Sequence, residues 1–193
     1  MRSKLSMILA TLVLLLVPAA AFASGGPWMM DVRGGVALPQ GDFGDAFKSG
    51  LLIGVEASKM MSTNLALGAE GNYIKNKGDE AVFGTGSDVE AKFMHYGVHG
   101  KYMLGKSDSK MMPYMVAGAG LYNIKVDTGV TDDSETKFGL RGGVGMNWMM
   151  GPKMGLGFQA DYNDVMTEGT SSQYIGLSAG LHFMLSPSSA SSH

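Results

Sequence analysis

Apolar and polar residues alternate with a period of two along most of this chain. The clearest case is the segment 173–184, where one parity carries apolar side chains and the other carries small or polar ones. Successive side chains of a β-strand point to opposite faces, so this period predicts a strand. About ten residues at about 3.3 Å each, tilted by about 40°, cross a hydrocarbon layer of about 25 Å. The segment therefore predicts a membrane-spanning strand.

Eight segments show this alternation, and each is bounded by Gly, Pro, Asp or Asn residues that are typical of turns. The predicted strands are residues 28–38, 51–61, 65–74, 89–104, 111–124, 137–150, 154–163 and 173–184. The fifth leaves two alternatives for its outward face: Tyr114, Val116 and Tyr122, or Met115, Ala117 and Leu121. A barrel of about eight strands is just filled by its own side chains. The pattern predicts an all-β fold, an eight-stranded antiparallel up-and-down barrel.

The two faces of the predicted strands differ in a way that separates a membrane barrel from a soluble one. One face carries bulky apolar residues, with aromatic residues such as Trp28, Tyr102 and Trp148 near the strand ends. The other face carries isolated charges among small residues. A lipocalin-like barrel turns its apolar face to a ligand cavity, whereas a membrane barrel turns it to lipid and has aromatic girdles at both interfaces. We therefore expect a transmembrane barrel.

The chain begins with the features of a secretory signal peptide. Arg2 and Lys4 precede an apolar run, and residues 21–23 form a small-x-small cleavage site, so we expect a signal peptide at 1–23. The barrel is then expected at 24–184, followed by a short polar tail at 185–193. The absence of cysteine excludes a disulfide framework, so stability must come from burial and backbone pairing.

The connections between the predicted strands alternate in length, which predicts an orientation. Those at 62–64, 105–110 and 151–153 are short, whereas those at 40–49, 75–88, 125–136 and 164–172 are longer. Outer-membrane barrels have short periplasmic turns and long external loops, so both barrel termini are expected in the periplasm. The long connections hold eleven acidic residues and four lysines, so the external face is expected to be acidic. Without the expected signal peptide the chain holds 13 Lys and Arg residues against 17 Asp and Glu residues, which argues against nucleic acid as a partner.

Charged residues on the inward face form the main candidate site. Glu56 and Glu70 lie opposite one another if residues 62–64 form a three-residue hairpin loop. Two such carboxylates can be a catalytic pair, or they can be neutralised by lumen cations in a buried network, which is the interpretation we favour. Arg141 and Asp161 meet across the hairpin at 151–153, directly or one diagonal step apart. The network expected to close the lumen contains Arg33, Glu56, Glu70, Lys101, Arg141 and Asp161.

Other candidate ligands are weaker. Four strand residues place His95 and His99, and likewise Ser178 and His182, about 13 Å apart, which is too far for one metal ion or a catalytic hydrogen bond. One acidic connection could bind a divalent cation but lacks the D-x-D-x-D-G spacing of a calcium loop, so we expect a solvated loop. Its residues are Asp127, Asp132, Asp133 and Glu135. We expect no bound metal and no cofactor.

Methionine is unusually frequent, with 17 residues in the chain. Twelve of them lie at or near strand ends that the predicted orientation places at the periplasm. A ring of thioethers could bind Cu(I), which prefers soft ligands. We favour the alternative that methionine is a flexible apolar filler at the membrane boundary.

Three short motifs resemble the small outer-membrane β-barrel family that includes OmpX, OmpW and the transmembrane domain of OmpA. They are VALPQGDF at 36–43, Pro113-Tyr114 followed by Gly118-x-Gly120, and Tyr174-x-Gly176-Leu177 running to Phe183. The resemblance implies a Gram-negative outer-membrane location and a non-enzymatic structural or surface-interaction role. It also implies outer-membrane lipid and lipopolysaccharide as partners, and we expect a monomer.

Two alternatives follow from the same resemblance. OmpW-like relatives suggest a narrow carrier for small hydrophobic compounds, which needs an apolar pocket near the external mouth that the polar lumen positions do not supply. Lipid A deacylases of the same barrel size suggest a lipid A-modifying enzyme, which needs a serine, a histidine and a carboxylate in contact.

Overall fold

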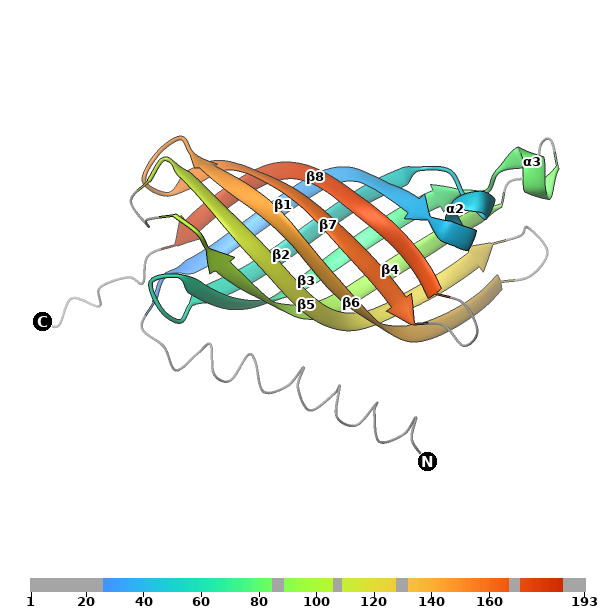
Figure 1. Ribbon diagram of the computed structural model, residues 1–193, viewed down its shortest axis with the longest axis horizontal. Helices are drawn as coiled ribbons and strands as arrows, with labels where there is room; N and C mark the ends of the chain where they lie inside the picture. The colour runs from blue at the N-terminus through green and yellow to red at the C-terminus, as the bar shows by residue number, and fades with distance from the viewer. Residues whose placement is uncertain (1–25, 85–88, 106–108, 128–131, 167–170, 186–193) are drawn as a thin grey trace, which may run out of the picture.

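The computed structural model describes residues 26–84, 89–105, 109–127, 132–166 and 171–185. Within these ranges, eight antiparallel strands pair in chain order and close into a barrel (Figure 1). They are β1 (Trp28–Gln40), β2 (Gly50–Met60), β3 (Leu65–Lys77), β4 (Glu90–Met103), β5 (Met111–Asp127), β6 (Asp132–Met149), β7 (Met154–Met166) and β8 (Ser171–Leu185). The predicted all-β barrel is confirmed. The predicted signal peptide and the tail from residue 186 lie outside the described residues.

The two ends of the barrel differ in their connections. The termini end, where β1 begins and β8 ends, has the connections 61–64, 104–110 and 150–153. The helix end carries two short helices that the alternation did not predict, α2 (Gly41–Ala46) and α3 (Glu80–Phe83). Gly41 has a φ of 56°, a conformation that favours glycine, where β1 turns into α2. The described residues include no helix that is long and apolar enough to cross a bilayer.

Residue Asp79 starts α3 by capping its first turn. Its carboxylate accepts a hydrogen bond of 2.9 Å from the amide of Ala81, and this bond lowers the pKa of the carboxyl group. The side chain lies 3.6 Å from the ammonium of Lys48, a weaker second contribution.

The strands extend further at the helix end than the alternation predicted. β3 continues to Lys77 and β5 to Asp127, while β6 already begins at Asp132. The prediction of a long loop at 125–136 is therefore wrong for most of its residues. Backbone pairing continues where a strand leaves the bilayer, but both faces then meet water, so the apolar-polar alternation fades before the ladder ends.

Exposure alternates along the strands as predicted. In β1, Val32 is 47% exposed and Arg33 is 4% exposed. In β5 the ambiguity is resolved, because Met115 is exposed whereas Tyr114 and Val116 are buried. The outward face is thus apolar and the inward face fills the lumen, as expected of a barrel in lipid.

Side chains in the lumen form three layers along the barrel axis. At the helix end an apolar cluster combines residues from seven strands, with Phe43 and Phe47 packed against it. A polar layer occupies the middle, and a smaller apolar cluster that includes Met29, Met103 and Tyr114 lies at the termini end. The polar middle layer contains the predicted site.

Candidate functional site: a charged network in the barrel lumen

Glu56 on β2 and Glu70 on β3 lie directly opposite one another, so the predicted register is confirmed. Each carboxylate is paired with its own arginine. The Nη2 of Arg33 lies 2.7 Å from the Oε2 of Glu56, and the Nη1 of Arg141 lies 2.8 Å from the Oε2 of Glu70. The four side chains are buried, so these pairs are poorly screened by solvent.

Lys101 joins two carboxylates from neighbouring strands. Its ammonium contacts Glu56 and lies 3.1 Å from the Oδ2 of Asp31. The other Asp31 oxygen accepts a hydrogen bond of 2.8 Å from the Nδ1 of His182 on β8. His182 on β8, Asp31 on β1, Glu56 on β2 and Lys101 on β4 are thus linked in one network across the lumen.

The predicted relation between Arg141 and Asp161 holds in the sheet but not in the ion pairs. Asp161 is opposite Gly143, which places it one diagonal step from Arg141. The ion pairs of Arg141 nevertheless go to Glu70 and, at 3.8 Å, to Glu56. Asp161 instead accepts from the side-chain amides of Gln159 and Asn163 on its own strand. The carboxylate of Asp161 is therefore hydrogen-bonded by these two amides, and Arg141 forms its ion pairs with carboxylates on the other side of the lumen.

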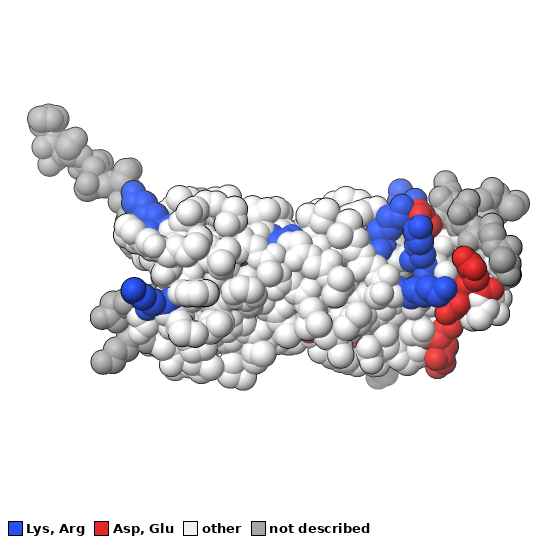
Figure 2. All heavy atoms as spheres, turned by 90° about the horizontal axis from the view of Figure 1, so that it is seen from above, with Lys and Arg blue, Asp and Glu red and all other residues white. Residues whose placement is uncertain are grey.

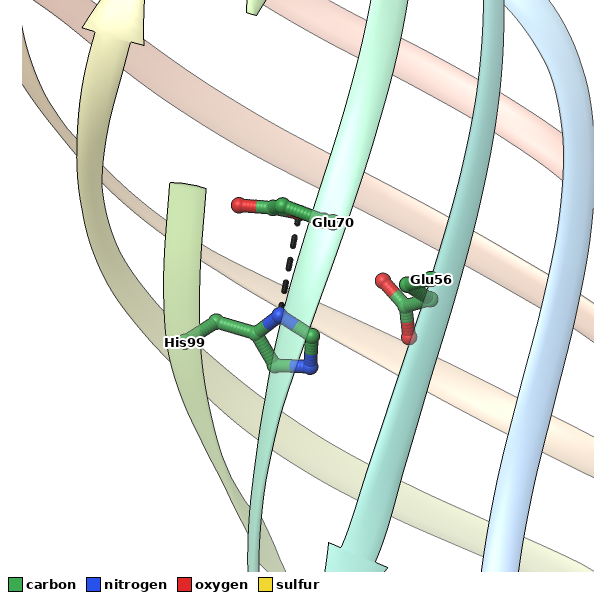
Figure 3. Close-up of side chains that lie close together, drawn as sticks. All are labelled: Glu56, Glu70 and His99. Atoms are coloured by element: carbon green, nitrogen blue, oxygen red, sulfur yellow. Dashed lines mark ion pairs between the residues drawn. The ribbon is translucent and has the colours of Figure 1, made fainter. Parts of the chain in front are cut away.

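Three side chains of this layer form the cluster that could hold a metal ion (Figure 3). Glu56, Glu70 and His99 each offer a ligand atom, and these atoms lie within 4.8 Å of one another. The Nδ1 of His99 is 3.8 Å from Glu70, and its Nε2 is 3.3 Å from the Oγ of Ser58. Two carboxylates and an imidazole suit a divalent ion.

The cations around this cluster argue against a metal ion there. Arg33, Lys101 and Arg141 already contact the two carboxylates, so a divalent ion would add positive charge to a buried region that is already compensated. The same ion pairs argue against a catalytic carboxylate pair, since each carboxylate is already paired with an arginine.

Sequence reasoning missed several members of the layer. Asp31, Ser58 and His182 share the inward parity of the predicted residues, which was the available signal, but their partners come from the β1–β8 closure and from contacts across the lumen. His95 and His99 have separate neighbours, as their spacing predicted. The Nδ1 of His95 is 3.0 Å from the side-chain amide of Asn72, and its ring stacks on Tyr122.

The predicted divalent-cation residues lie on paired strand ends rather than in a loop. Asp127 is opposite Asp132 at the helix end of β5 and β6. The side chains of Asp127, Asp132 and Asp133 lie outside the described residues. Glu135 is exposed and forms an ion pair with Lys137.

The expectation that lumen positions near the helix end are polar is wrong. The eight buried residues of that layer are Ala37, Leu52, Ile74, Ala91, Phe93, Tyr122, Val165 and Tyr174. Phe43 makes an edge-on contact with Phe93, with ring centroids 5.3 Å apart. All of them except Val165 lie at inward positions inside the predicted strands, and Phe43 and Phe47 join them from the segment between β1 and β2. Closure of the barrel therefore brings together an apolar layer that the pattern of the single strands did not reveal.

A family comparison now identifies this fold. The model of the outer membrane protein beta-barrel domain matches residues 9–183. The chain belongs to this family. It is an outer-membrane barrel of the Gram-negative type, and the predicted resemblance is confirmed. A comparison with curated proteins found no match.

Solved structures of other outer-membrane barrels are similar to this member of the family. Neisserial surface protein A is 22% identical with a TM-score of 0.61, and the match covers 83% of this chain and 97% of that one. The attachment invasion locus protein Ail of Yersinia pestis is 15% identical with a TM-score of 0.53, covering 83% and 100%. The N-terminal barrel of Pseudomonas aeruginosa OprF is 14% identical with a TM-score of 0.53, covering 82% and 98%. These identities show a shared fold alone.

Proposed function

We propose that this outer-membrane barrel has a closed lumen, no enzymatic activity, and a structural and surface-interaction role at its helix end. In this proposal the helix end faces the cell exterior and both barrel termini face the periplasm. Outer-membrane lipid and lipopolysaccharide are its partners, and the barrel is a monomer. The observation that carries the proposal is the ion-pair network between Arg33, Glu56, Glu70, Lys101 and Arg141.

A solute that crossed the lumen would have to separate these ion pairs. Removing one partner from a buried ion pair leaves an uncompensated charge and costs about 3–5 kcal/mol. The apolar layer with Phe43 and Phe47 adds a second barrier at the helix end. Both layers favour a filled interior over a channel.

The test of the closed lumen is solute flux in liposomes. Vesicles that contain the refolded barrel should take up arabinose and glycine no faster than empty vesicles, whereas a sixteen-stranded porin serves as the open control. Solute flux well above that of empty vesicles would contradict the proposal. The flux must disappear when the barrel is precipitated from the mixture before the vesicles are formed.

A carrier for small hydrophobic compounds is the second candidate, and the apolar layer favours it. Phe43 and Phe47 lie at the outer boundary of this layer, where such a compound would enter. The same vesicles distinguish the two functions with a small hydrophobic dye trapped by an internal binding protein. Uptake that is faster than in empty vesicles and is changed by Phe47→Ala would favour the carrier.

The helix end also presents a row of lysines toward the surrounding lipid. Lys75, Lys92 and Lys125 are directly opposite one another on β3, β4 and β5, and they share the outward parity of Tyr73 and Met94. Figure 2 shows a band of basic residues near this end, with acidic residues beyond it at the tip. On the face shown, most of the acidic residues thus lie closer to the tip than the basic band does.

Adjacent like charges across strands are destabilising, so this lysine row needs anions. Glu90 supplies one carboxylate, 2.7 Å from Lys75 and 3.1 Å from Lys92. Lys125 is exposed and has no ion-pair partner among the described side chains. In the proposed orientation this row faces the outer leaflet, whose lipopolysaccharide carries phosphate groups. The proposal is that the lysine row binds them directly, although the long connections as a whole hold more acidic residues than lysines.

A further inference from the structure

Methionine side chains line the inner wall of the barrel at the termini end. Six strands contribute one each on the inward face: Met29, Met60, Met103, Met112, Met149 and Met184. Met29 is 1% exposed, Met112 4% and Met103 5%. Inward methionines are therefore shared by six of the eight strands at this end of the barrel.

Three of these thioethers share one hollow. Met112 from β5, Met149 from β6 and Met184 from β8 line a space of about 270 Å³ that opens beside the hairpin 150–152. Met112 is buried, and the other two are half-buried. The hollow is large enough for an ion and is accessible from the termini end.

Two buried side chains with unpartnered polar atoms lie one inward position deeper on β6 and β8 than the methionines that line this hollow. His182 precedes Met184 by two residues on the same face of β8 and is fully buried. Its Nε2 has no hydrogen-bond partner among the described residues. Gly155 on β7 pairs with Met149 on the neighbouring strand β6 and with His182 on the other neighbour, β8. Because Gly155 has no side chain, no side chain of β7 lies between Met149 and His182 at this level of the sheet. Asn147, opposite Met112, is also fully buried, and neither of its side-chain polar atoms has a described partner.

The hydrogen bond to Asp31 prepares His182 as a ligand. A carboxylate only accepts, so the 2.8 Å contact makes Nδ1 the donor to Asp31. Such a bond orients a metal-binding imidazole and fixes the tautomer whose Nε2 carries a free lone pair. A buried polar atom without a partner is destabilising, and a bound ion would remove this penalty.

The chemistry of these donors selects a soft ion. Thioethers and imidazole suit Cu(I), whereas Ca²⁺ and Mg²⁺ require oxygen ligands. The charge of the lumen also suits a monovalent ion. Four buried carboxylates of the described lumen (Asp31, Glu56, Glu70 and Asp161) face three basic side chains (Arg33, Lys101 and Arg141).

We propose that the termini end of the lumen binds one soft monovalent metal ion, Cu(I) or its analogue Ag(I). The ligands are the thioethers of Met112, Met149 and Met184 and the Nε2 of His182. This site does not depend on the surface role proposed above, and it is separate from the cluster of Glu56, Glu70 and His99.

The test is titration of the refolded full-length barrel with Ag(I) in a detergent and buffer free of thiols and halides, followed by calorimetry and native mass spectrometry. One ion should bind per barrel. The triple variant Met112→Leu, Met149→Leu and Met184→Leu keeps similar volume and should weaken binding by at least about 100-fold. The matched control replaces the outward methionines Met111, Met115 and Met154 with leucine and should bind as the wild type does.

Methyl-labelled methionine gives a second measurement that needs no variant. On addition of Ag(I), the ε-methyl signals of Met112, Met149 and Met184 should shift, and those of Met111, Met115 and Met154 should not. Equal affinity of the two triple variants, or shifts confined to the outward methionines, would overturn the proposal. The same conclusion would follow if the wild type bound no ion.

Discussion

The guanidinium of Arg141 lies 2.8 Å from the carboxylate of Glu70, across the lumen and three strands away in the sheet. This contact joins opposite parts of the barrel wall through side chains alone. It follows that Glu70, rather than the diagonal neighbour Asp161, is the energetic partner of Arg141.

Replacing Arg141 should therefore destabilise the barrel strongly. Arg141→Met removes the cation nearest to Glu70 and should lower the free energy of unfolding by about 3–5 kcal/mol, since it leaves a buried carboxylate unpaired. Urea-induced unfolding of the barrel in lipid vesicles measures this change.

A double-mutant cycle identifies the partner. Adding Glu70→Leu to Arg141→Met should recover part of the loss, with a coupling free energy of about 1 kcal/mol or more. Adding Asp161→Leu should recover none of it. Recovery with Asp161→Leu but not with Glu70→Leu would show that the arginine pairs along the sheet and not across the lumen.

A charge introduced on the outward face should destabilise the barrel, whereas a small change on the inward face should have little effect. Val144 is 56% exposed and Leu177 is 42% exposed on the outward face, so Val144→Arg and Leu177→Arg should each cost about 2–4 kcal/mol in a bilayer. Ser178 faces the lumen, and Ser178→Ala should change stability by less than about 1 kcal/mol. Folding yields in vesicles that are equal for all three variants would contradict the assignment of faces.

Two glycines of β6 form a matched pair for a packing test. A Cβ added at Gly145 would collide with the ring of Tyr114 and lie 2.7 Å from the carbonyl oxygen of Phe158, whereas one added at Gly142 meets nothing within 4 Å. Gly145→Ala should thus destabilise the barrel by about 1–3 kcal/mol, and Gly142→Ala should be tolerated. Thermal unfolding in detergent compares the two, and similar midpoints would show that the lumen relaxes around the added methyl group.

The lysine row predicts direct recognition of lipid phosphate. In nanodiscs, the variant with Lys75→Gln, Lys92→Gln and Lys125→Gln should bind bisphosphorylated lipid A about tenfold more weakly than the wild type, because three charge contacts of modest strength are lost. Lys110→Gln with Lys153→Gln, at the termini end, is the matched control and should have no effect.

Chelation separates this contact from a cation bridge. Binding through the lysine row should persist in EDTA and weaken with salt, since exposed charges are screened. Binding that disappears in EDTA and is unchanged by the lysine variant would instead favour bridging of the acidic residues by divalent cations.

Much of the fold was determined by the sequence alone. A period of two in side-chain chemistry identifies each strand and both of its faces, since a one-residue slip would move every apolar group from lipid into the lumen. The short hairpin at 62–64 also determined a register, and for that reason the opposition of Glu56 and Glu70 was predictable. These are local properties, and local sequence is sufficient to determine them.

Only the tertiary structure decided which side chains meet across the lumen. The partners of Arg141 and of His182 depend on how β1 closes on β8 and on the width of the closed barrel, which no local pattern contains. The continuation of strands to Asp127 and from Asp132 was likewise hidden, because backbone pairing outside lipid no longer imposes alternation. Sequence periodicity records the environment of each face, whereas side-chain contacts between distant strands are determined by closure of the sheet.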